Sequence, residues 1–311
     1  MRLLQRTGYS LNKSPTIDIV VPCYNVAYIV EHCVSSLLKQ SYSENAITIY
    51  LVNDGSSDTT GEILESFSYH QHVKIIHNEK NRGLSATRNS GIQAGDGEVI
   101  CFLDSDMTVN SDWVSAHLNI LGKNNIVGVL GDSHLPEGQQ PNKLDRYLYD
   151  SRRGARRFGE GIPIRFSHFL FNNTSLKRSV FDVIELFDEN ITSYGGEDTE
   201  LAIRLWEEYP DGLRFSFSAV CEHHHSRELN EFCNSMYLYG KTNLPSLLEQ
   251  FPQYSAELGG EWIKSMKGYI LFNPIMRWVV SKSRHIFSSY WLSRYQVIDA
   301  VIRGARSVSH R

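Results

Sequence analysis

The chain has 311 residues, a formal net charge of −4 and 41% hydrophobic residues, which is typical of a globular protein with one large or two average domains. This charge balance argues against nucleic acid and against a strongly acidic partner. The sequence begins without an apolar leader and has no run of about 18 uncharged apolar residues, so we expect neither a signal peptide nor a membrane span. Five scattered cysteines predict a reducing, cytoplasmic location, without disulfides or a zinc site.

Five short apolar segments predict strands, which begin near residues 17, 47, 73, 98 and 126. The intervals of about 25 to 30 residues are typical of βαβ units. Residues 26–38 have helical spacing with one apolar face, and helices are also expected over 84–95 and 112–121. The sequence therefore predicts the α/β class, with a mostly parallel, Rossmann-like central sheet covered by helices on both faces.

The second half of the chain departs from this rhythm. Residues 133–165 are polar and rich in Gly and Pro, as in a long functional or mobile loop. We then expect a strand and a helix in 169–184, a helix in 194–210, an alternating strand in 213–225 and three helices beyond 230. The predicted organisation is a polar lead (1–16), a main domain (17–230, with halves 17–132 and 166–230) and a C-terminal helical extension (231–311).

Two acids, Asp104 and Asp106, directly follow the apolar strand that starts near residue 98. On an extended backbone both side chains would point to the same side. Like charges held this close repel each other unless a proton or a cation intervenes. Carboxylate oxygens suit Mg²⁺ or Mn²⁺, and such an ion binds phosphates, so a nucleotide diphosphate is the expected ligand. The alternative is a solvated turn with two surface acids.

Four segments together resemble glycosyltransferase family 2, namely residues 17–42, 51–60, 78–107 and 195–205. The resemblance is dense over 17–130 and thinner over 166–226. It implies the GT-A fold and an inverting, metal-dependent transfer of a sugar from a UDP-sugar to a hydroxyl acceptor. Two alternatives stay open: a nucleotidyltransferase-like enzyme, and a non-catalytic glycan- or nucleotide-binding module. The turn after the first strand lacks the Gly- and Lys/Arg-rich loop that a nucleotidyltransferase normally has there.

The resemblance also implies the residues of the donor site. Asp54 would accept a hydrogen bond from the uracil ring, or act as the Asx residue of its own turn. Arg88 would lie near phosphate or its acidic neighbours, or form a surface salt bridge. The expected nucleotide-binding residues are Pro22, Tyr24, Asn25, Asp54, Asn81, Gly83, Arg88, Asp104 and Ser105.

For the metal, the resemblance implies Asp106 as ligand, supported by Asp104. A strand would direct His223 and His225 to one side and His224 to the other, so we expect His223, or else His225, to join the site. Such a histidine, with the GGED sequence at 195–198, fits a subset resembling chondroitin polymerase and N-acetylgalactosaminyl- or galactosyltransferase domains. A nitrogen ligand favours Mn²⁺ over Mg²⁺. Three solvent-exposed surface histidines are the alternative.

Glu197 and Asp198 stand at an expected helix start, where negative charge is favourable. By resemblance, Asp198 is the general base for the acceptor hydroxyl, and Glu197 binds the acceptor or the sugar. We expect Gly195 and Gly196 to leave room for the sugar. Capping of the helix by the two acids is the alternative.

Two basic segments complete the expectations. The run at 151–158 is either a solvated charge run or a lid over the diphosphate that orders on donor binding. The tail from Arg277 to Arg311 interleaves basic and aromatic residues, so it would lie on the inner face of a membrane, pack on the main domain or contact a second subunit. The acceptor class stays open among glycans, lipid-linked saccharides and peptides, and the donor sugar is not determined.

Overall fold

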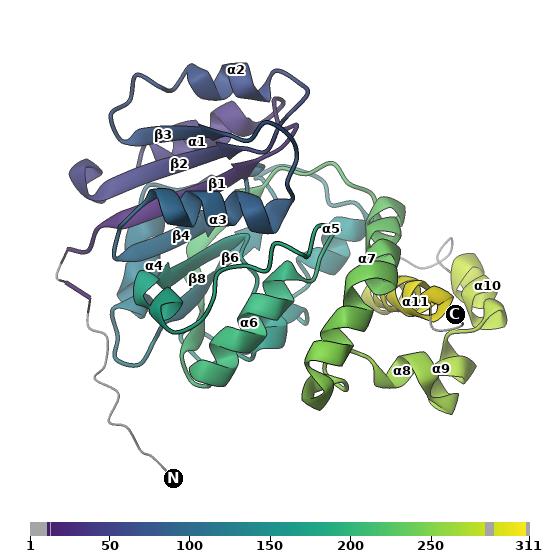
Figure 1. Cartoon of the computed structure of the whole chain (residues 1–311). Coiled ribbons are helices and arrows are strands. Elements are labelled where there is room, and N and C mark those ends of the chain that lie inside the picture. Colours follow the sequence, from purple (N-terminus) through teal and green to yellow (C-terminus); the bar gives the residue numbers. More distant parts are fainter. Residues whose placement is uncertain (1–10, 13, 284–288, 309–311) are drawn as a thin grey trace, which may run out of the picture.

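The computed structural model describes residues 11–12, 14–283 and 289–308 (Figure 1). Its centre is an eight-stranded sheet with the order β3-β2-β1-β4-β7-β6-β8-β5. β1 to β4, β6 and β8 run in one direction, and β5 and β7 run antiparallel to their neighbours, so the predicted mostly parallel sheet is confirmed. The strands are β1 (Ile17–Cys23), β2 (Ile47–Asn53), β3 (Val73–His77), β4 (Val99–Leu103), β5 (Met107–Val109), β6 (Gly128–His134), β7 (Asn173–Lys177) and β8 (Leu213–His223).

Helices cover both faces of the sheet, as the alternation along β1 requires. Ile19 and Val21 contribute to one hydrophobic core, whereas Val20 faces the other. The first core is closed by α1 (Val30–Leu37), α2 (Thr60–Glu65) and α4 (Trp113–Leu121), and the second by α3 (Leu84–Ala94) and α6 (Glu197–Glu208).

A buried polar network holds β7 in its place between β4 and β6. The Asn173 side-chain oxygen accepts hydrogen bonds from Trp113 Nε1 at 2.8 Å and from His117 Nε2 at 3.1 Å. Its amide nitrogen donates to the carbonyls of Asp132 and Ala219. Because buried polar groups are costly when unpaired, this network favours one register of the inserted strand.

Three expectations about the second half were wrong. The expected loop at 133–165 contains α5 (Lys143–Leu148), which starts with a reciprocal capping box between Asn142 and Asp145. The helix expected after β7 is a single 3₁₀ turn, Arg178–Asp182. The three expected C-terminal helices are five, because Ser265 ends one short helix and caps the next. These are α7 (Leu229–Gln250), α8 (Glu261–Lys264), α9 (Met266–Leu271), α10 (Pro274–Ser283) and α11 (Tyr290–Val308).

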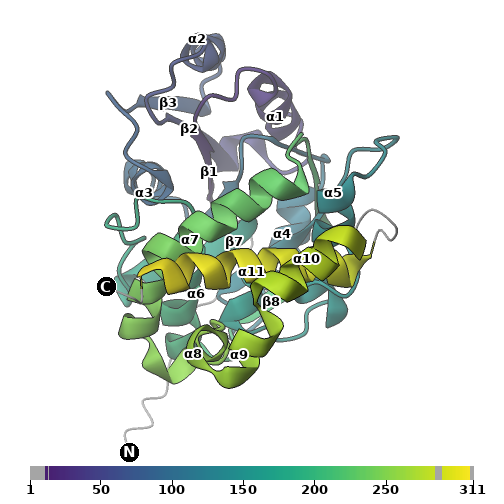
Figure 2. The same ribbon diagram turned by 90° about the vertical axis from the view of Figure 1, so that its right-hand side faces the viewer.

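Two glycines allow α7 and α11 to pack closely along each other (Figure 2). A Cβ at Gly240 would collide with the carbonyl of Val301, and one at Gly304 with that of Tyr237. Leu247 and Phe251, at the end of α7, belong to the core of the sheet domain, so the helical extension is anchored on it. No helix in the described part of the chain is long and apolar enough to cross a membrane.

Candidate active site

A cleft of about 990 Å³ opens where β1, β2 and β4 end and α6 begins. Ligands of such sheets bind at the carboxyl ends of the strands. Of the residues expected to form the site, Asn25 and Ser105 do not line the cleft. The others do: Pro22, Tyr24, Asp54, Asn81, Gly83, Arg88, Asp104, Asp106, Glu197, Asp198, His223 and His225.

Asp54 organises the wall of the cleft. Its Oδ1 accepts hydrogen bonds from Asn78 Nδ2 and from the backbone N–H of Arg82, and its Oδ2 from the N–H of Gly83. The residue is buried, and a carboxylate has about four acceptor sites, so one remains for a ligand. Gly83 has φ +89°, a conformation that glycine adopts without strain. Both interpretations of Asp54, as loop organiser and as ligand acceptor, are therefore compatible with its geometry.

Asn25 and Ser105 do not line the cleft but form hydrogen bonds that support the turns next to it. Asn25 has φ +52° and accepts a hydrogen bond from the backbone N–H of Ser57, which joins the turns after β1 and β2. Ser105 is buried and hydrogen-bonds the Cys23 thiol. Neither residue lines the cleft, so direct contact of either with a nucleotide stays a prediction.

Arg88 is buried at the centre of the site, with 1% of its side chain exposed. Its Nη1 donates to Asp198 Oδ1 at 2.6 Å, and its Nη2 lies 3.3 Å from Asp104 Oδ1. The alternative of a surface salt bridge is excluded. One permanent cation thus joins the acid that follows β4 to an acid in the first turn of α6.

Asp104 and Asp106 lie in a tight turn between β4 and β5, in which the N–H of Met107 donates to the carbonyl of Asp104. The expectation of an extended backbone was wrong, because the chain reverses here to start the short strand β5. The two carboxylates consequently diverge: Asp104 faces Arg88, and Asp106 Oδ2 lies 3.2 Å from His223 Nε2.

The environment separates the pKa values of these acids. Burial raises the pKa of Asp104 to about 6, with Arg88 opposing and Asp106 adding to the shift. Burial acts against the charged forms of Asp106 and His223 as well. Their mutual hydrogen bond and charge attraction together outweigh it, so the pKa of Asp106 is lowered and that of His223 is raised.

The three consecutive histidines take different directions. His223 faces Asp106, and its Nδ1 is hydrogen-bonded to the Tyr149 hydroxyl at 3.0 Å. His225 Nε2 lies 3.2 Å from Asp145 Oδ1, and its Nδ1 accepts from a backbone N–H. His224 has a different partner, because its Nε2 is hydrogen-bonded to Thr108 Oγ1. The geometry favours His223 over His225 as a partner of Asp106.

The chemistry of this pair suits a small divalent cation. Two donor atoms at about 2.1 Å from an octahedral Mg²⁺ and at right angles are roughly 3 Å apart, close to the separation of Asp106 and His223. In the described part of the chain no three His, Cys, Asp or Glu side chains converge to hold an ion by themselves.

The two acids at the start of α6 are held tightly. Asp198 Oδ2 accepts from the backbone N–H of Phe171, while its Oδ1 accepts from Arg88. Glu197 is buried, and this burial, with the charge of Asp198, raises the pKa of Glu197 to about 7, although Arg88 opposes the shift. The pair thus includes a carboxyl group that titrates near neutral pH.

The two glycines before these acids allow the backbone conformation of the turn that precedes α6. Gly195 and Gly196 have φ values of +78° and +104°. A Cβ at either position would lie against Tyr239 or Asn243 of α7, and the Asn243 amide donates to the carbonyl of Gly195. Both glycines also line the cleft, so the expectation that they leave room for a sugar stays a prediction.

The four arginines of the basic run each have a partner, but Arg152 and Arg157 are exposed to solvent, so a solvated run stays an alternative for them. Arg153 and Arg156 also line the cleft; ordering on donor binding remains a prediction. The partners of Arg152, Arg153, Arg156 and Arg157 are, in that order, Asp150, the ring of Tyr147, Asp132 and the ring of His168.

Sequence analysis missed several residues of the cleft because their positions depend on tertiary structure. Tyr149 follows α5 in the expected loop, and no local pattern points to its contact with His223. Further lining residues come from the segment before α6, from the stretch before α7, and from α7 and α11: Tyr194, Arg227, Phe232, Met236, Tyr239 and Val297. The helical extension therefore forms part of the wall.

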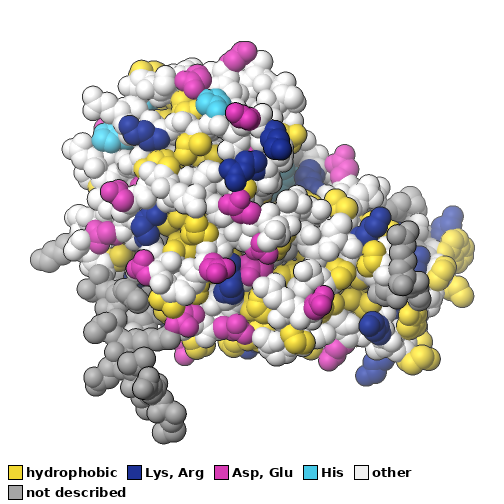
Figure 3. Space-filling view, in the orientation of Figure 1, with side chains coloured by type: hydrophobic (Ala, Val, Ile, Leu, Met, Phe, Trp, Pro, Cys, Tyr) yellow, Lys and Arg dark blue, Asp and Glu magenta, His cyan; other side chains and the backbone are white. Residues whose placement is uncertain are grey.

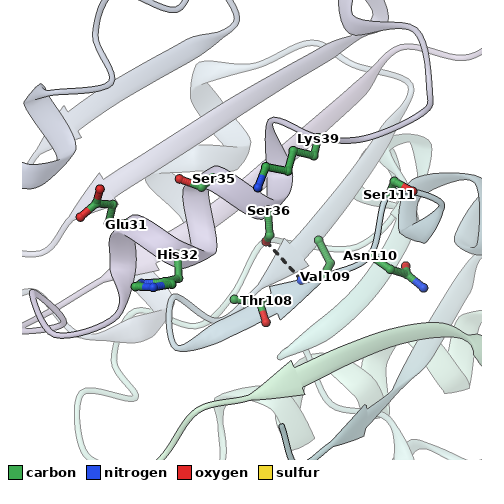
Figure 4. Close-up of a pocket in the computed structure, with 9 residues that line it drawn as sticks. All are labelled: Glu31, His32, Ser35, Ser36, Lys39, Thr108, Val109, Asn110 and Ser111. Atoms are coloured by element: carbon green, nitrogen blue, oxygen red, sulfur yellow. Dashed lines mark hydrogen bonds between the residues drawn. The ribbon is translucent and has the colours of Figure 1, made fainter. Parts of the chain in front are cut away.

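A second, smaller hollow of about 490 Å³ lies between α1 and β5 (Figure 4). It is lined by exposed polar side chains such as Glu31 and Lys39, and the Ser36 hydroxyl accepts a hydrogen bond from the N–H of Val109 there. Buried charged groups such as Asp54, Arg88 and Glu197 line the large cleft, so we place the candidate site there.

Comparisons with known proteins identify the family of the chain. A family model described as Glycosyl transferase family 2 matches residues 18–182, more than half of the chain. The chain is 45% identical over 98 residues to the uncharacterized glycosyltransferase EpsJ of Bacillus subtilis, an alignment that covers 31% of this chain and 28% of EpsJ. The chain thus spans less than a third of that relative's length.

Two solved structures share the fold. TarS 1–349 of S. aureus, in a complex with UDP-GlcNAc, has a TM-score of 0.55 at 15% identity, with 95% of this chain and 92% of that chain covered. The mannosyltransferase PcManGT of Pyrobaculum calidifontis, in complex with GDP-Man and Mn²⁺, has a TM-score of 0.65 at 13% identity, with 97% and 90% covered. This likeness shows the GT-A fold with a C-terminal helical region, as predicted.

Proposed function

The chain belongs to glycosyl transferase family 2 and carries a glycosyltransferase domain, and from this premise we propose that it transfers a sugar from a UDP-sugar to a hydroxyl acceptor. The proposed transfer inverts the anomeric carbon and depends on a divalent cation, Mn²⁺ or Mg²⁺. The GGED sequence and His223 support membership of the subset resembling chondroitin polymerase and N-acetylgalactosaminyl- or galactosyltransferase domains. A reducing compartment remains the expected location from the cysteine pattern.

The observation that carries this proposal is the buried guanidinium of Arg88. It bonds Asp198 and Asp104 together at 2.6 and 3.3 Å. Asp104 ends β4, where the donor is expected, and Asp198 opens α6 on the opposite wall. A base and a leaving-group site therefore face one cleft, as a single in-line displacement requires.

The charge balance supports a role for a cation. Four carboxylates meet in the site, and Arg88 and His223 are the basic groups paired with them in the described part of the chain. The remaining negative charge can be neutralised by a doubly charged ion. Asp106 and His223 would hold it, and when bound it would supply Lewis-acid stabilisation of the departing diphosphate.

The chain's own residues account for the other steps. Asp198 accepts the proton of the acceptor hydroxyl as its oxygen bonds to the anomeric carbon and the bond from that carbon to the diphosphate oxygen breaks, so UDP leaves. Arg88 and the N–H of Phe171 fix the direction of Asp198. Tyr24, half exposed at the rim, offers a ring face for the base, and Asp54 offers its free acceptor site.

The class of the donor and the class of the acceptor are proposed separately. The UDP-GlcNAc complex of TarS and the GDP-Man complex of PcManGT support a nucleotide-sugar donor. The acid Asp54 favours UDP, since its open acceptor site suits the uracil N–H. The acceptor is proposed to be a glycan, a lipid-linked saccharide or a peptide.

The proposal is tested by nucleotide release. The purified chain is incubated with UDP-GlcNAc, UDP-GalNAc, UDP-Gal, UDP-Glc or GDP-Man, with and without Mn²⁺, and free UDP or GDP is measured. We expect slow, Mn²⁺-dependent release from one UDP-sugar, which the Asp198→Asn variant lacks. Binding without any release would indicate a non-catalytic module, and production of pyrophosphate from UTP and a sugar phosphate would indicate a nucleotidyltransferase.

A further inference from the structure

We propose that α9 and α10 form a face that docks the protein onto an anionic lipid bilayer. Hydrophobic side chains gather over these helices, with Lys and Arg among them, at the end of the molecule away from β3 (Figure 3). We define the bilayer face by its exposed apolar residues, which are Met266, Ile270, Leu271, Ile275, Trp278 and Val279.

The exposure of these residues is unusual for their size. Met266 is 75% exposed, Ile275 72%, and Ile270 and Trp278 63% each. Single exposed apolar residues are ordinary on a protein surface, but several on two consecutive short helices mark an interaction site. Burial of this face by a partner would remove a large apolar area from water.

The segment that carries the bilayer face has charged residues of one sign. Between Glu261 and Asp299 the sequence has no Asp or Glu, although the whole chain carries a net charge of −4. Lys264, Lys267 and Lys282 are exposed on α8, α9 and α10. Each basic side chain close to an anionic leaflet strengthens binding several-fold. An apolar face bordered by lysines, with a tryptophan in it, has the composition of interfacial helices.

A second copy of the chain suits this face poorly. A symmetric dimer would oppose the same lysines across the interface, with no acid in the segment to pair with them. The part of the tail that folds inward is α11, where Tyr295 donates to the carbonyl of Leu271 and stacks on Phe272. The predicted basic aromatic tail therefore has two parts: α10 carries exposed residues of the bilayer face, whereas α11 packs against the rest of the protein. Phe287 is not among the described residues.

The experiment is vesicle flotation of the full chain. Vesicles of phosphatidylcholine alone are compared with vesicles that also contain phosphatidylglycerol, at low and high salt. We expect flotation with the anionic vesicles, which salt weakens. The pairs Ile275→Ser with Trp278→Ser, and Lys267→Glu with Lys282→Glu, should each reduce the bound fraction on the order of tenfold. Tyr69→Ser, which removes an equally exposed side chain beyond α2, is the matched control and should bind normally.

Several results would overturn the proposal. These are failure of the unaltered chain to float, equal flotation on neutral and anionic vesicles, and equal binding of the variants and the control. A concentration-dependent dimer that both double variants abolish, seen by light scattering, would assign the face to a second copy. Melting temperatures check that the variants fold. Nucleotide release is measured in parallel, so the membrane proposal and the proposed transfer can fail separately.

Discussion

Replacement of Glu197 by Gln should stabilise the protein at alkaline pH and leave its stability nearly unchanged in acid. Glu197 is 8% exposed, and burial together with the charge of Asp198 raises its pKa from an ordinary 4.5 to about 7. A pKa rise of this size means that ionising Glu197 costs roughly 3 kcal/mol more in the folded protein than in the unfolded chain. Gln keeps the shape and removes the charge, so the substitution isolates the cost of ionising this buried group.

The direction in which stability changes with pH follows from proton linkage. Below pH 4.5 the carboxyl group is protonated in both states, so it does not penalise the fold. Between pH 4.5 and about 7 the unfolded chain releases the proton and the folded protein keeps it, so the contribution of Glu197 to stability falls as pH rises. Above pH 7 the full penalty of about 3 kcal/mol applies. The free energy of unfolding of the variant should therefore exceed that of the parent by that amount at pH 8, and by little at pH 4.5.

Urea denaturation at several pH values, followed by tryptophan fluorescence, measures this difference. Taking the difference between variant and parent cancels the contributions of the titrating groups that do not interact with Glu197. Glu62→Gln on the exposed surface of α2 is the control, and its difference should not depend on pH. Equal stabilities of parent and Glu197→Gln across the range, or a variant less stable at pH 8, would refute a raised pKa for this group.

Three further predictions concern the proposed chemistry. Asp198→Asn should keep UDP binding by calorimetry but lower turnover at least about 10²-fold, since it removes the base; retained turnover would assign the proton to another group. Asp106→Ala should abolish the part of UDP binding that needs Mn²⁺, and unchanged binding with and without the ion would contradict the proposed ligand. Tyr149→Phe should weaken Mn²⁺-dependent UDP binding about tenfold because His223 loses the hydrogen bond that orients it; an unchanged affinity would show that this hydroxyl does not tune the ligand.

Local sequence patterns predicted the first half of the fold well. The β-branched strands and the helix with one apolar face between them form a repeating local unit, and β1 to β4 follow it. The insertion of β7 between β4 and β6 could not be predicted in this way. It depends on Asn173 meeting Trp113 and His117 of α4, a contact between residues that no local period connects. The three-residue strand β5 is too short to give a period at all.

The same distinction applies to the site. Motifs identified the acids and Arg88, since each stands beside a strand end or a helix start. The residues that contact these groups could not be predicted from the sequence, because their positions depend on tertiary packing. Tyr149, which orients His223, comes from a segment expected to be a loop, and Tyr239 and Asn243 close the glycine turn from a helix assigned to a separate extension.

The paired acids after β4 show why spacing alone was misleading. Asp104 and Asp106 were expected to share one cation because an extended chain aligns side chains two residues apart. The turn at this point separates them, so that Asp106 takes His223 and Asp104 takes Arg88. Asp104 instead shares a guanidinium with Asp198, which is remote in sequence. Arg88 thus provides part of the counter-charge, as one of the expectations for this residue allowed, and the negative charge that remains is what a divalent ion would have to balance.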